Sequence, residues 1–417
     1  MSWRQRVREL EAENQFLREK IEQLERLLKS YENPHTPSSK KRKKNTERDE
    51  NQPRFPGKPK GSNGGGIQLP PPDEFEKHEL KACPDCDGKL HETGLRKQTV
   101  IDFPEKPIIT TEHHILQYYC SACDKHVEAR PSLPNGIYGR RLRSMVIMLK
   151  NLTNSHEKIA SLMRDLGAPS FSAAQVQRIA GCYAAALQPK RDAYLDILRR
   201  ESYVHADETG FRKDGKNGWV WGVFTKSIAI FSAQMSRARN EINELIPGYT
   251  GVLVSDGLSV YADFKSRQRC WAHLLREAKD SAAKNEEIAV QYHRLKLLYD
   301  QLKILNNKPP NYAAIDAAKE QLKDIVTCLQ AIKAGRKLAT LIANGGQDWF
   351  TALYHESVPL DNNHAERELR SIVLLRKTIG CYRNHKGKEW IDIVMSVIHT
   401  WKLQGLNVFQ QLNVVAN

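Results

Sequence analysis

The sequence predicts a multidomain chain of mixed α+β or α/β class, in which a small β-sheet lies between helical regions. Its 417 residues are enough for two or three domains. Residues 201–260 alternate apolar and polar positions and favour β-branched and aromatic residues, which is typical of strands. The segments on either side repeat apolar residues every three or four positions, as helices do.

The chain is basic, with a formal net charge of +15 and an isoelectric point near 9.3. This imbalance favours a polyanionic partner, and nucleic acid before a membrane surface. No run approaches the roughly 18 to 20 apolar residues of a membrane span, and the first residues lack the apolar core of a signal peptide. We therefore expect a cytoplasmic protein, associated with the nucleoid in a prokaryote.

Residues 1–32 carry a heptad pattern. One seam position is filled by Leu10, Leu17 and Leu24, and the other by Asn14, Ile21 and Leu28. The pattern predicts a short coiled coil, and a single seam Asn favours a parallel homodimer because its amide is satisfied only by its mate. An amphipathic helix packed on its own chain fits the same pattern.

Residues 33–72 form a linker rich in Pro, Gly, Ser and Lys, which is too polar to fold alone and is expected to be disordered. It contains a basic run that can neutralise DNA phosphates and release counterions. The run consists of Lys40, Lys41, Arg42, Lys43 and Lys44. A solvated linker without a DNA contact is an equal interpretation.

Residues 73–135 contain two CxxC pairs, Cys83 with Cys86 and Cys120 with Cys123. This spacing lets two thiolates converge from a tight turn, so two pairs complete a closed tetrahedral site. The strand-like segment that ends at Cys120 is expected to form a hairpin that returns the second pair to the first. The sequence thus predicts a zinc-ribbon-like module that holds structural Zn²⁺.

Residues 136–200 predict a helical region that contains a helix, a turn and a second helix. Gly167 and Pro169 are expected to end the first helix, and Ser172 to cap the second. The arrangement fits a DNA-reading helix-turn-helix, and it also fits a plain packing unit.

Three acidic residues are candidates for a shared metal site. Asp207 and Asp256 each end a predicted strand, and Glu366 lies on a later predicted helix. If the first and fourth strands are neighbours, the aspartates lie side by side, which is costly unless cations lie between them. Oxygen ligands suit Mg²⁺ or Mn²⁺, and two such ions can drive in-line displacement at a phosphodiester. The nearby alternatives are Glu208, Asp263 and Asp361.

Four motifs around these acids carry a family resemblance: HADET at 205–209, SDG at 255–257, CWAH at 270–273 and NNHAERELR at 362–370. Together they resemble the catalytic domain of insertion sequence family 66 transposases. The similarity extends to the leucine-repeat helix, the paired cysteines, the helical region and the C-terminal segment, and so covers nearly the whole chain. In the C-terminal segment, Cys381 and Tyr382 replace the glycine and aromatic residue usual in the family.

The resemblance implies a ribonuclease-H-like catalytic core, built from residues 201–274 and 351–380. A helical insertion at 275–350 interrupts this core, and residues 381–417 form a C-terminal helical segment.

The resemblance also implies site residues. Asp207, Asp256 and Glu366 match the DDE triad that binds two Mg²⁺ or Mn²⁺ ions. His273 matches a Cys-x-x-His signature of several DDE families and is either an aid to catalysis or a structural residue. Arg367 and Arg370 are candidate DNA contacts on the helix of the glutamate, where Arg370 alternatively pairs with Glu366.

The activity implied is DNA cleavage at the ends of an insertion sequence, followed by strand transfer. The implied partners are terminal inverted repeats, target DNA, a second copy of the chain or a higher assembly, and other proteins encoded by the element. Two alternatives stay open: a ribonuclease-H-like nuclease without strand transfer, and a domesticated or inactive transposase that acts only as a DNA-binding protein.

Overall fold

The computed structural model describes residues 71–75, 101, 103–122, 124–129, 133 and 136–415. The chain divides into two compact units, Met1–Ile101 and Asp102–Asn417, and the fold below is that of the second unit. The expected coiled coil at 1–32 and the basic run from Lys40 to Lys44 lie outside the described residues. No helix within the described ranges is both long and apolar enough to cross a membrane.

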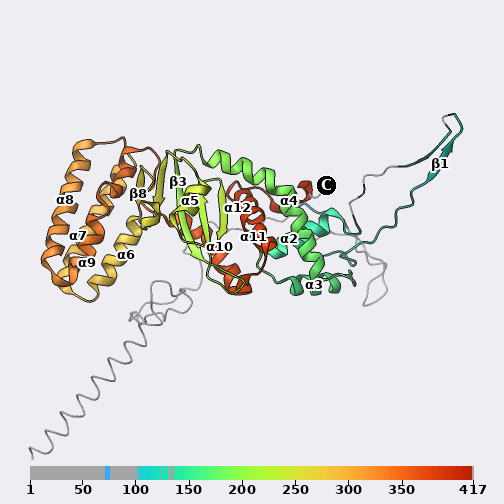
Figure 1. Ribbon diagram of the computed structural model, residues 1–417, viewed down its shortest axis with the longest axis horizontal. Helices are drawn as coiled ribbons and strands as arrows, with labels where there is room; N and C mark the ends of the chain where they lie inside the picture. Colours follow the sequence, from blue (N-terminus) through green and yellow to red (C-terminus); the bar gives the residue numbers. More distant parts are fainter. Residues whose placement is uncertain are drawn as a thin grey trace, which may run out of the picture. The chain divides into compact units, whose positions relative to one another are not determined.

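The centre of the second unit is a five-stranded sheet in the order β6-β5-β3-β7-β8 (Figure 1). Its strands are β3 Tyr203–Gly210, β5 Trp219–Phe224, β6 Ala229–Gln234, β7 Val252–Ser255 and β8 Arg267–Arg269. β3, β5 and β6 pair antiparallel in a meander, whereas β7 and β8 run parallel to β3. The first and fourth strands of the sheet in chain order are therefore neighbours. With helices before and after the sheet, the mixed α and β class is confirmed.

The sequence predicts four of these strands, and also α5 (Arg239–Leu245) between β6 and β7. Two details of the prediction are wrong. β3 continues to Gly210, so Asp207 lies inside the strand and not at its end. The sequence does not predict β8, because this strand contains no apolar residue. Its Gln268 is fully buried, and the side-chain amide bonds the backbones of Trp349 and Ala352.

Alternation along the strands separates the two faces of the sheet. On one face, Ala206 of β3 shares a hydrophobic core with Ile242 of α5. On the other face, Phe224 of β5 shares a core with Leu369 of α10 (Asn363–Ile379). Asp207 pairs with Gly222, two residues before Phe224, and so lies on the face that α10 covers.

Three helices precede the sheet: α2 Arg140–Asn151, α3 His156–Asp165 and α4 Ala173–Leu198. The predicted turn lies between α3 and α4. Gly167 has a φ of 111°, in the left-handed region that ends helices, and the Ser172 hydroxyl accepts a hydrogen bond from the amide of Gln175. Both local predictions are confirmed.

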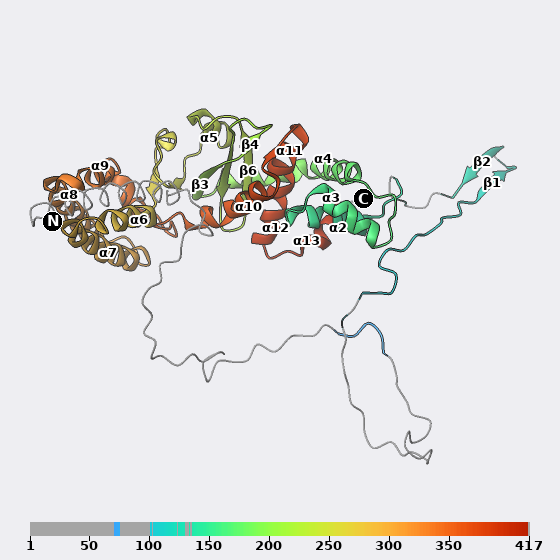
Figure 2. The same cartoon turned by 90° about the horizontal axis from the view of Figure 1, so that it is seen from below.

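The chain after β8 is helical almost to its end, as the sequence predicts. The first four of these helices stand side by side and share a core with β7 (Figures 1 and 2). They are α6 Trp271–Ala282, α7 Glu286–Asn306, α8 Tyr312–Ala331 and α9 Arg336–Ala343. Four short 3-10 helices lie among these elements in the described chain: η1 (Ser259–Tyr261) follows β7, η2 (Lys333–Gly335) joins α8 to α9, and η3 (Gly346–Trp349) and η4 (Thr351–Tyr354) lie between α9 and α10.

The C-terminal elements follow α10. They are β9 Cys381–Tyr382, α11 His385–Glu389, the π-helical η5 Trp390–Met395, α12 Ser396–Leu403 and α13 Val408–Val415. β9 pairs in parallel with β4 (Arg212–Lys213), which follows β3. Cys381 and Tyr382, the two departures from the family pattern, thus form a strand that ties this segment to the end of β3.

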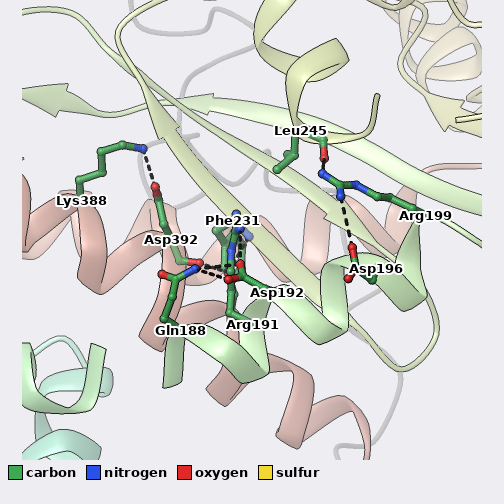
Figure 3. Close-up of polar contacts among 10 residues, drawn as sticks. Gln188, Arg191, Asp192, Asp196, Arg199, Phe231, Leu245, Lys388 and Asp392 are labelled. Carbon is green, nitrogen blue, oxygen red and sulfur yellow. Dashed lines mark hydrogen bonds and ion pairs between the residues drawn. The ribbon is translucent and has the colours of Figure 1, made fainter. Parts of the chain in front are cut away.

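Side chains of the C-terminal helices cap the edge strand β6. Its outward-facing amides donate to oxygens spaced four residues apart: Ala229 to Thr400, Phe231 to Ser396 and Ala233 to Asp392. Lys388 donates to the Ala233 carbonyl and to Asp392, as Figure 3 shows for the second contact. Residues four apart lie on one helical face, so a single face satisfies an edge that would otherwise recruit another strand.

The sequence predicts a hairpin between the two cysteine pairs, whereas the hairpin in the structure pairs β1 (Gln117–Cys120) with β2 (Lys125–Glu128) on either side of the second CxxC. The strand before Cys120 is confirmed, and its partner follows the CxxC. Cys83, Cys86 and Cys123 lie outside the described residues, and Cys120 is described only as the last residue of β1. The four-cysteine zinc site therefore stays a prediction.

Replacing Ser396 by Ala should leave the buried Phe231 amide without its acceptor and lower the free energy of unfolding by about 1 to 3 kcal/mol. Urea denaturation followed by tryptophan fluorescence measures this loss. Ser281→Ala is the matched control. Each of the two hydroxyls donates to the carbonyl four residues earlier, Ser396 to Asp392 and Ser281 to Glu277, but within the described residues Ser281 accepts no strand amide. Equal losses in the two variants would contradict the capping role.

Candidate active site

The parallel pairing of β3 and β7 sets two aspartates beside each other. His205 pairs with Val254, so the register continued by two residues brings Asp207 next to Asp256. Each carboxylate also accepts a nearby backbone amide: that of Glu208 to Asp207 at 2.9 Å, and that of Leu258 to Asp256 at 3.0 Å. Both side chains keep partial exposure to solvent. The conditional expectation that these two acids are neighbours is met.

This crowding affects the protonation of Asp207. Burial raises the pKa of its carboxyl well above the ordinary value, and the charges of Glu208, Asp256 and, more weakly, Glu366 raise it further. The hydrogen bond from the Glu208 amide acts in the opposite direction. Like charges in one site favour the proton-bound form unless cations neutralise them. The arrangement therefore favours a cation beside Asp207.

The helix that carries Glu366 is held to the sheet by Asn362, the N-cap residue of α10, which is fully buried. Its side-chain amide donates to the Ala206 carbonyl at 2.9 Å, and its side-chain oxygen lies 2.8 Å from Nδ1 of His205. Its backbone N–H donates to Sγ of Cys270 at 3.1 Å. One residue thus joins α10 to β3 and to the residue before α6.

The protonation of His205 follows from these contacts. Because the NH₂ group of Asn362 points at a carbonyl, its oxygen must accept, and Nδ1 of His205 must carry the hydrogen. Burial lowers the pKa of His205 to about 4, so the ring is neutral near pH 7. His205 supports the helix of Glu366, a role that the sequence analysis missed. The signal was its position two residues before Asp207, on the same face of the strand.

The CWAH motif clamps the segment that leads into α10. The backbone amide of Trp271 donates to the Leu360 carbonyl at 3.0 Å, and its indole donates to the Trp349 carbonyl at 2.6 Å. Burial raises the pKa of the Cys270 thiol to about 11, so it stays protonated and accepts the Asn362 amide as a structural group. Two motifs far apart in the sequence are therefore in direct contact.

His273 and Arg276 lie three residues apart on α6 and both face Glu366. Nε2 of His273 is 3.4 Å from Oε1 of Glu366, and a guanidinium nitrogen of Arg276 is 3.6 Å from the same oxygen. Both distances exceed ordinary hydrogen bonds. Oε1 of Glu366 and Nδ1 of His273 are buried, and neither has a hydrogen-bond partner in the described part of the chain.

An orphaned carboxylate oxygen beside two crowded aspartates offers an all-oxygen donor set, which fits Mg²⁺ or Mn²⁺. Within residues 136–415 and the shorter described ranges, however, no three His, Cys, Asp or Glu side chains are close enough to hold an ion as they stand. The three acids approach one another without forming a closed cage.

The alternative acids have other partners. Glu208 points to the opposite face of the sheet, where Arg237 and Tyr261 bind its carboxylate. Asp263 accepts hydrogen bonds from Arg239 at 2.8 Å and Asn243 at 3.0 Å. Asp361 accepts the backbone amide of Asn363 at 3.1 Å and the Tyr299 hydroxyl at 3.3 Å. These contacts favour structural roles for all three.

Arg367 and Arg370 are both exposed on α10. Arg367 reaches Nδ1 of His364 at 3.5 Å. The ion pairs that Glu366 makes with described residues both come from α6, so they do not include Arg370. The pairing alternative for Arg370 is absent here.

Comparison with known proteins adds to this geometry. Residues 135–389, more than half of the chain, match the family described as Transposase IS66 family. The chain belongs to the IS66 transposase family. Membership makes this protein a nucleic-acid-processing transposase with DNA as its partner. Residues 81–124 match the zinc-finger binding domain of transposase IS66, a range that includes all four paired cysteines. That match supports a structural Zn²⁺ in this IS66 transposase.

One curated relative of this transposase is the uncharacterized protein y4jD of Sinorhizobium fredii (strain NBRC 101917 / NGR234). It is 22% identical over 398 residues, which span 82% of this chain and 76% of y4jD. This relative is itself uncharacterized, so the comparison shows similarity over most of the chain but indicates no activity.

Replacing Asn362 by Ala should expose the role of the anchor, because His205 and the Ala206 carbonyl both lose their partner. We expect a loss of about 2 to 6 kcal/mol in unfolding free energy, at about 1 to 3 kcal/mol for each of the two orphaned groups. Hydrogen exchange of the α10 amides should accelerate. Asn363→Ala is the matched control, since only its backbone amide bonds Asp361. Wild-type protection of α10 in Asn362→Ala would contradict the anchoring.

Proposed function

We propose that this IS66 transposase cleaves and joins DNA phosphodiesters at a site formed by Asp207, Asp256 and Glu366, which hold two Mg²⁺ or Mn²⁺ ions. The observation that carries the proposal is the parallel register of β3 and β7, which sets Asp207 beside Asp256, together with the buried Glu366 oxygen that has no hydrogen-bond partner among the described residues. Burial of Asp207 and the charges of its acidic neighbours, Asp256 and Glu366 among them, make an anion there unfavourable without cations. A catalytic site accepts this cost in the folded protein because the bound ions offset it.

We also propose that the sheet is the core of a ribonuclease-H-like domain made of residues 201–274 and 351–380. The support is its topology: an antiparallel meander of three strands, then two parallel strands, with Asp207 on the first strand and Asp256 directly after the fourth. Residues 275–350 are then the helical insertion, and residues 136–200 a DNA-binding region.

In the proposed mechanism the protein positions the DNA phosphodiester, and bound ions would polarise it. Asp207, on β3, and Asp256, directly after β7, would hold the ions, and Glu366 would complete the site from α10. When bound, the ions would stabilise charge on the attacking and leaving oxygens. Asn362 and His205 fix α10 on the sheet. His273, which lies beside Glu366, would exchange a proton near the scissile phosphate, and the exposed Arg367 and Arg370 would contact backbone phosphates.

The reaction that we propose has two displacements. Water attacks the phosphodiester at the element's end and frees a 3′ hydroxyl, and that hydroxyl then attacks target DNA in one transesterification. Terminal inverted repeats and target DNA are the substrates. A homodimer or higher assembly on DNA would bring two ends together, with other element-encoded proteins as further partners.

Neutral, isosteric replacement of the triad tests the assignment. Asp207→Asn, Asp256→Asn and Glu366→Gln should each reduce cleavage of duplexes bearing the terminal inverted repeats to background, because an amide binds a hard cation poorly. DNA binding should persist. Asp263→Asn is the matched control, an exposed acid paired with Arg239, and it should keep activity.

Full activity in any triad variant would refute the assignment of that residue. A wild-type protein that cuts the repeats but joins no 3′ end to target DNA would be a nuclease, and one that only binds would be a DNA-binding relative.

Metal addition should stabilise the wild type and not Asp207→Asn. A ligand at a hundred times its Kd adds about 2.7 kcal/mol to unfolding, which thermal melts with and without Mn²⁺ detect. Without the ion, Asp207→Asn should melt at or above the wild-type temperature, because the like-charge repulsion is gone. A wild-type response to Mn²⁺ in this variant would show that the ion binds elsewhere.

A further inference from the structure

We propose that Arg276 is a ligand for a DNA backbone phosphate, which Glu366 restrains until divalent ions take its carboxylate. The inference rests on the function proposed above. It adds a residue outside the triad and its flanking motifs, together with an order of events: ions bind first, then Arg276 engages DNA.

The approach of Arg276 to Glu366 is fixed by the fold. α6 and α10 are joined at their N-terminal ends by two contacts, from the Trp271 amide to the Leu360 carbonyl and from the Asn362 amide to Sγ of Cys270. Arg276 lies on the second turn of α6, three residues after His273 and on the same side. Its reach to Glu366 is therefore built into the helix pair.

The pair between Arg276 and Glu366 is longer than the arginine–carboxylate pair of Arg267 and Asp348. The Arg276 nitrogen is 3.6 Å from Oε1 of Glu366, whereas Arg267 reaches Asp348 at 2.8 Å. The Arg276 side chain is 53% exposed, and Oε1 has no hydrogen bond within the described residues. A pair with this geometry is easily exchanged for a stronger partner.

Ion binding would reverse the electrostatics around Arg276. Without ions, the carboxylates of Asp207, Asp256 and Glu366 attract the guanidinium. Two divalent ions outweigh the three negative charges, so the loaded site carries a small positive charge and no longer attracts Arg276. A guanidinium released at the exposed side of the site is suited to bidentate binding of phosphate.

The exchange couples the two ligands. If ions free Arg276 for DNA, ions raise DNA affinity, and by linkage DNA raises ion affinity by the same factor. The site then assembles tightly only when both are present, which restrains the metal-free protein from holding DNA at the triad.

Ion affinity is the first test, on the full chain and without DNA. Arg276→Gln keeps a polar side chain but frees Glu366, and it should tighten Mn²⁺ binding about two- to fivefold in calorimetry. Lys279→Gln is the matched control, because it removes one exposed charge from the same helix without a contact to Glu366. It should leave Mn²⁺ affinity unchanged.

Salt dependence of DNA binding is the second test. The probe is a duplex copied from the DNA that flanks the gene, titrated with Ca²⁺ and with no divalent ion. With Ca²⁺, Arg276→Gln should reduce the slope of log K against log salt by about 0.9, the value for one phosphate contact. Without ions the slope should equal that of the wild type. Any change caused by Lys279→Gln should be the same in both conditions.

The outcomes separate this inference from the proposed function. An unchanged or weaker Mn²⁺ affinity in Arg276→Gln, or an equal change of slope with and without Ca²⁺, overturns the exchange. Glu366→Gln decides the other question: it should weaken Mn²⁺ binding, and if it does not, Glu366 is no metal ligand and the triad itself fails.

Discussion

The site depends on one buried asparagine. Asn362 donates to the Ala206 carbonyl, accepts from His205 and donates its backbone amide to Cys270, so three segments meet at a fully buried residue. A buried amide left unpaired is costly, and this one is satisfied only when β3, α10 and the start of α6 are all in place. Glu366, one turn further along α10, takes its position from that bond network. The site geometry is in this sense a property of the packing and not of the acids themselves.

Much of the fold was accessible from the sequence because its elements follow simple periods. β3, β5, β6 and β7 alternate with period two, and Ser172 caps α4 where a hydroxyl stands before an apolar repeat. β8 was not accessible, because its Arg-Gln-Arg segment is held by the hydrogen bonds of Gln268. Asp207 was assigned to a strand end because the apolar run stops there, whereas pairing with β5 continues to Gly210.

The sequence predicted which residues form the candidate site, but not the contacts that hold those residues together. Motifs identify Asp207, Asp256, His273 and Glu366, but no sequence pattern indicates that HADET and CWAH both bind Asn362, the N-cap residue of α10. Spacing alone, without the motif, does not distinguish Asp207 from Glu208. The structure separates them by face: Glu208 pairs with Arg237, whereas the contacts of Asp207 among the described residues are a backbone amide and acidic neighbours. Uncompensated negative charge marks the functional carboxylate better than spacing does.

The central claim is that three carboxylates, brought together by β3, β7 and α10, grip divalent ions. Anomalous diffraction at the manganese edge from crystals grown with Mn²⁺ tests it most directly. The account predicts two Mn²⁺ peaks within coordination distance of the carboxylates of Asp207, Asp256 and Glu366, with the Glu366 oxygen moved away from Arg276. Peaks that lie elsewhere, or a Glu366 that still faces α6 while Mn²⁺ occupies the two aspartates, would contradict it.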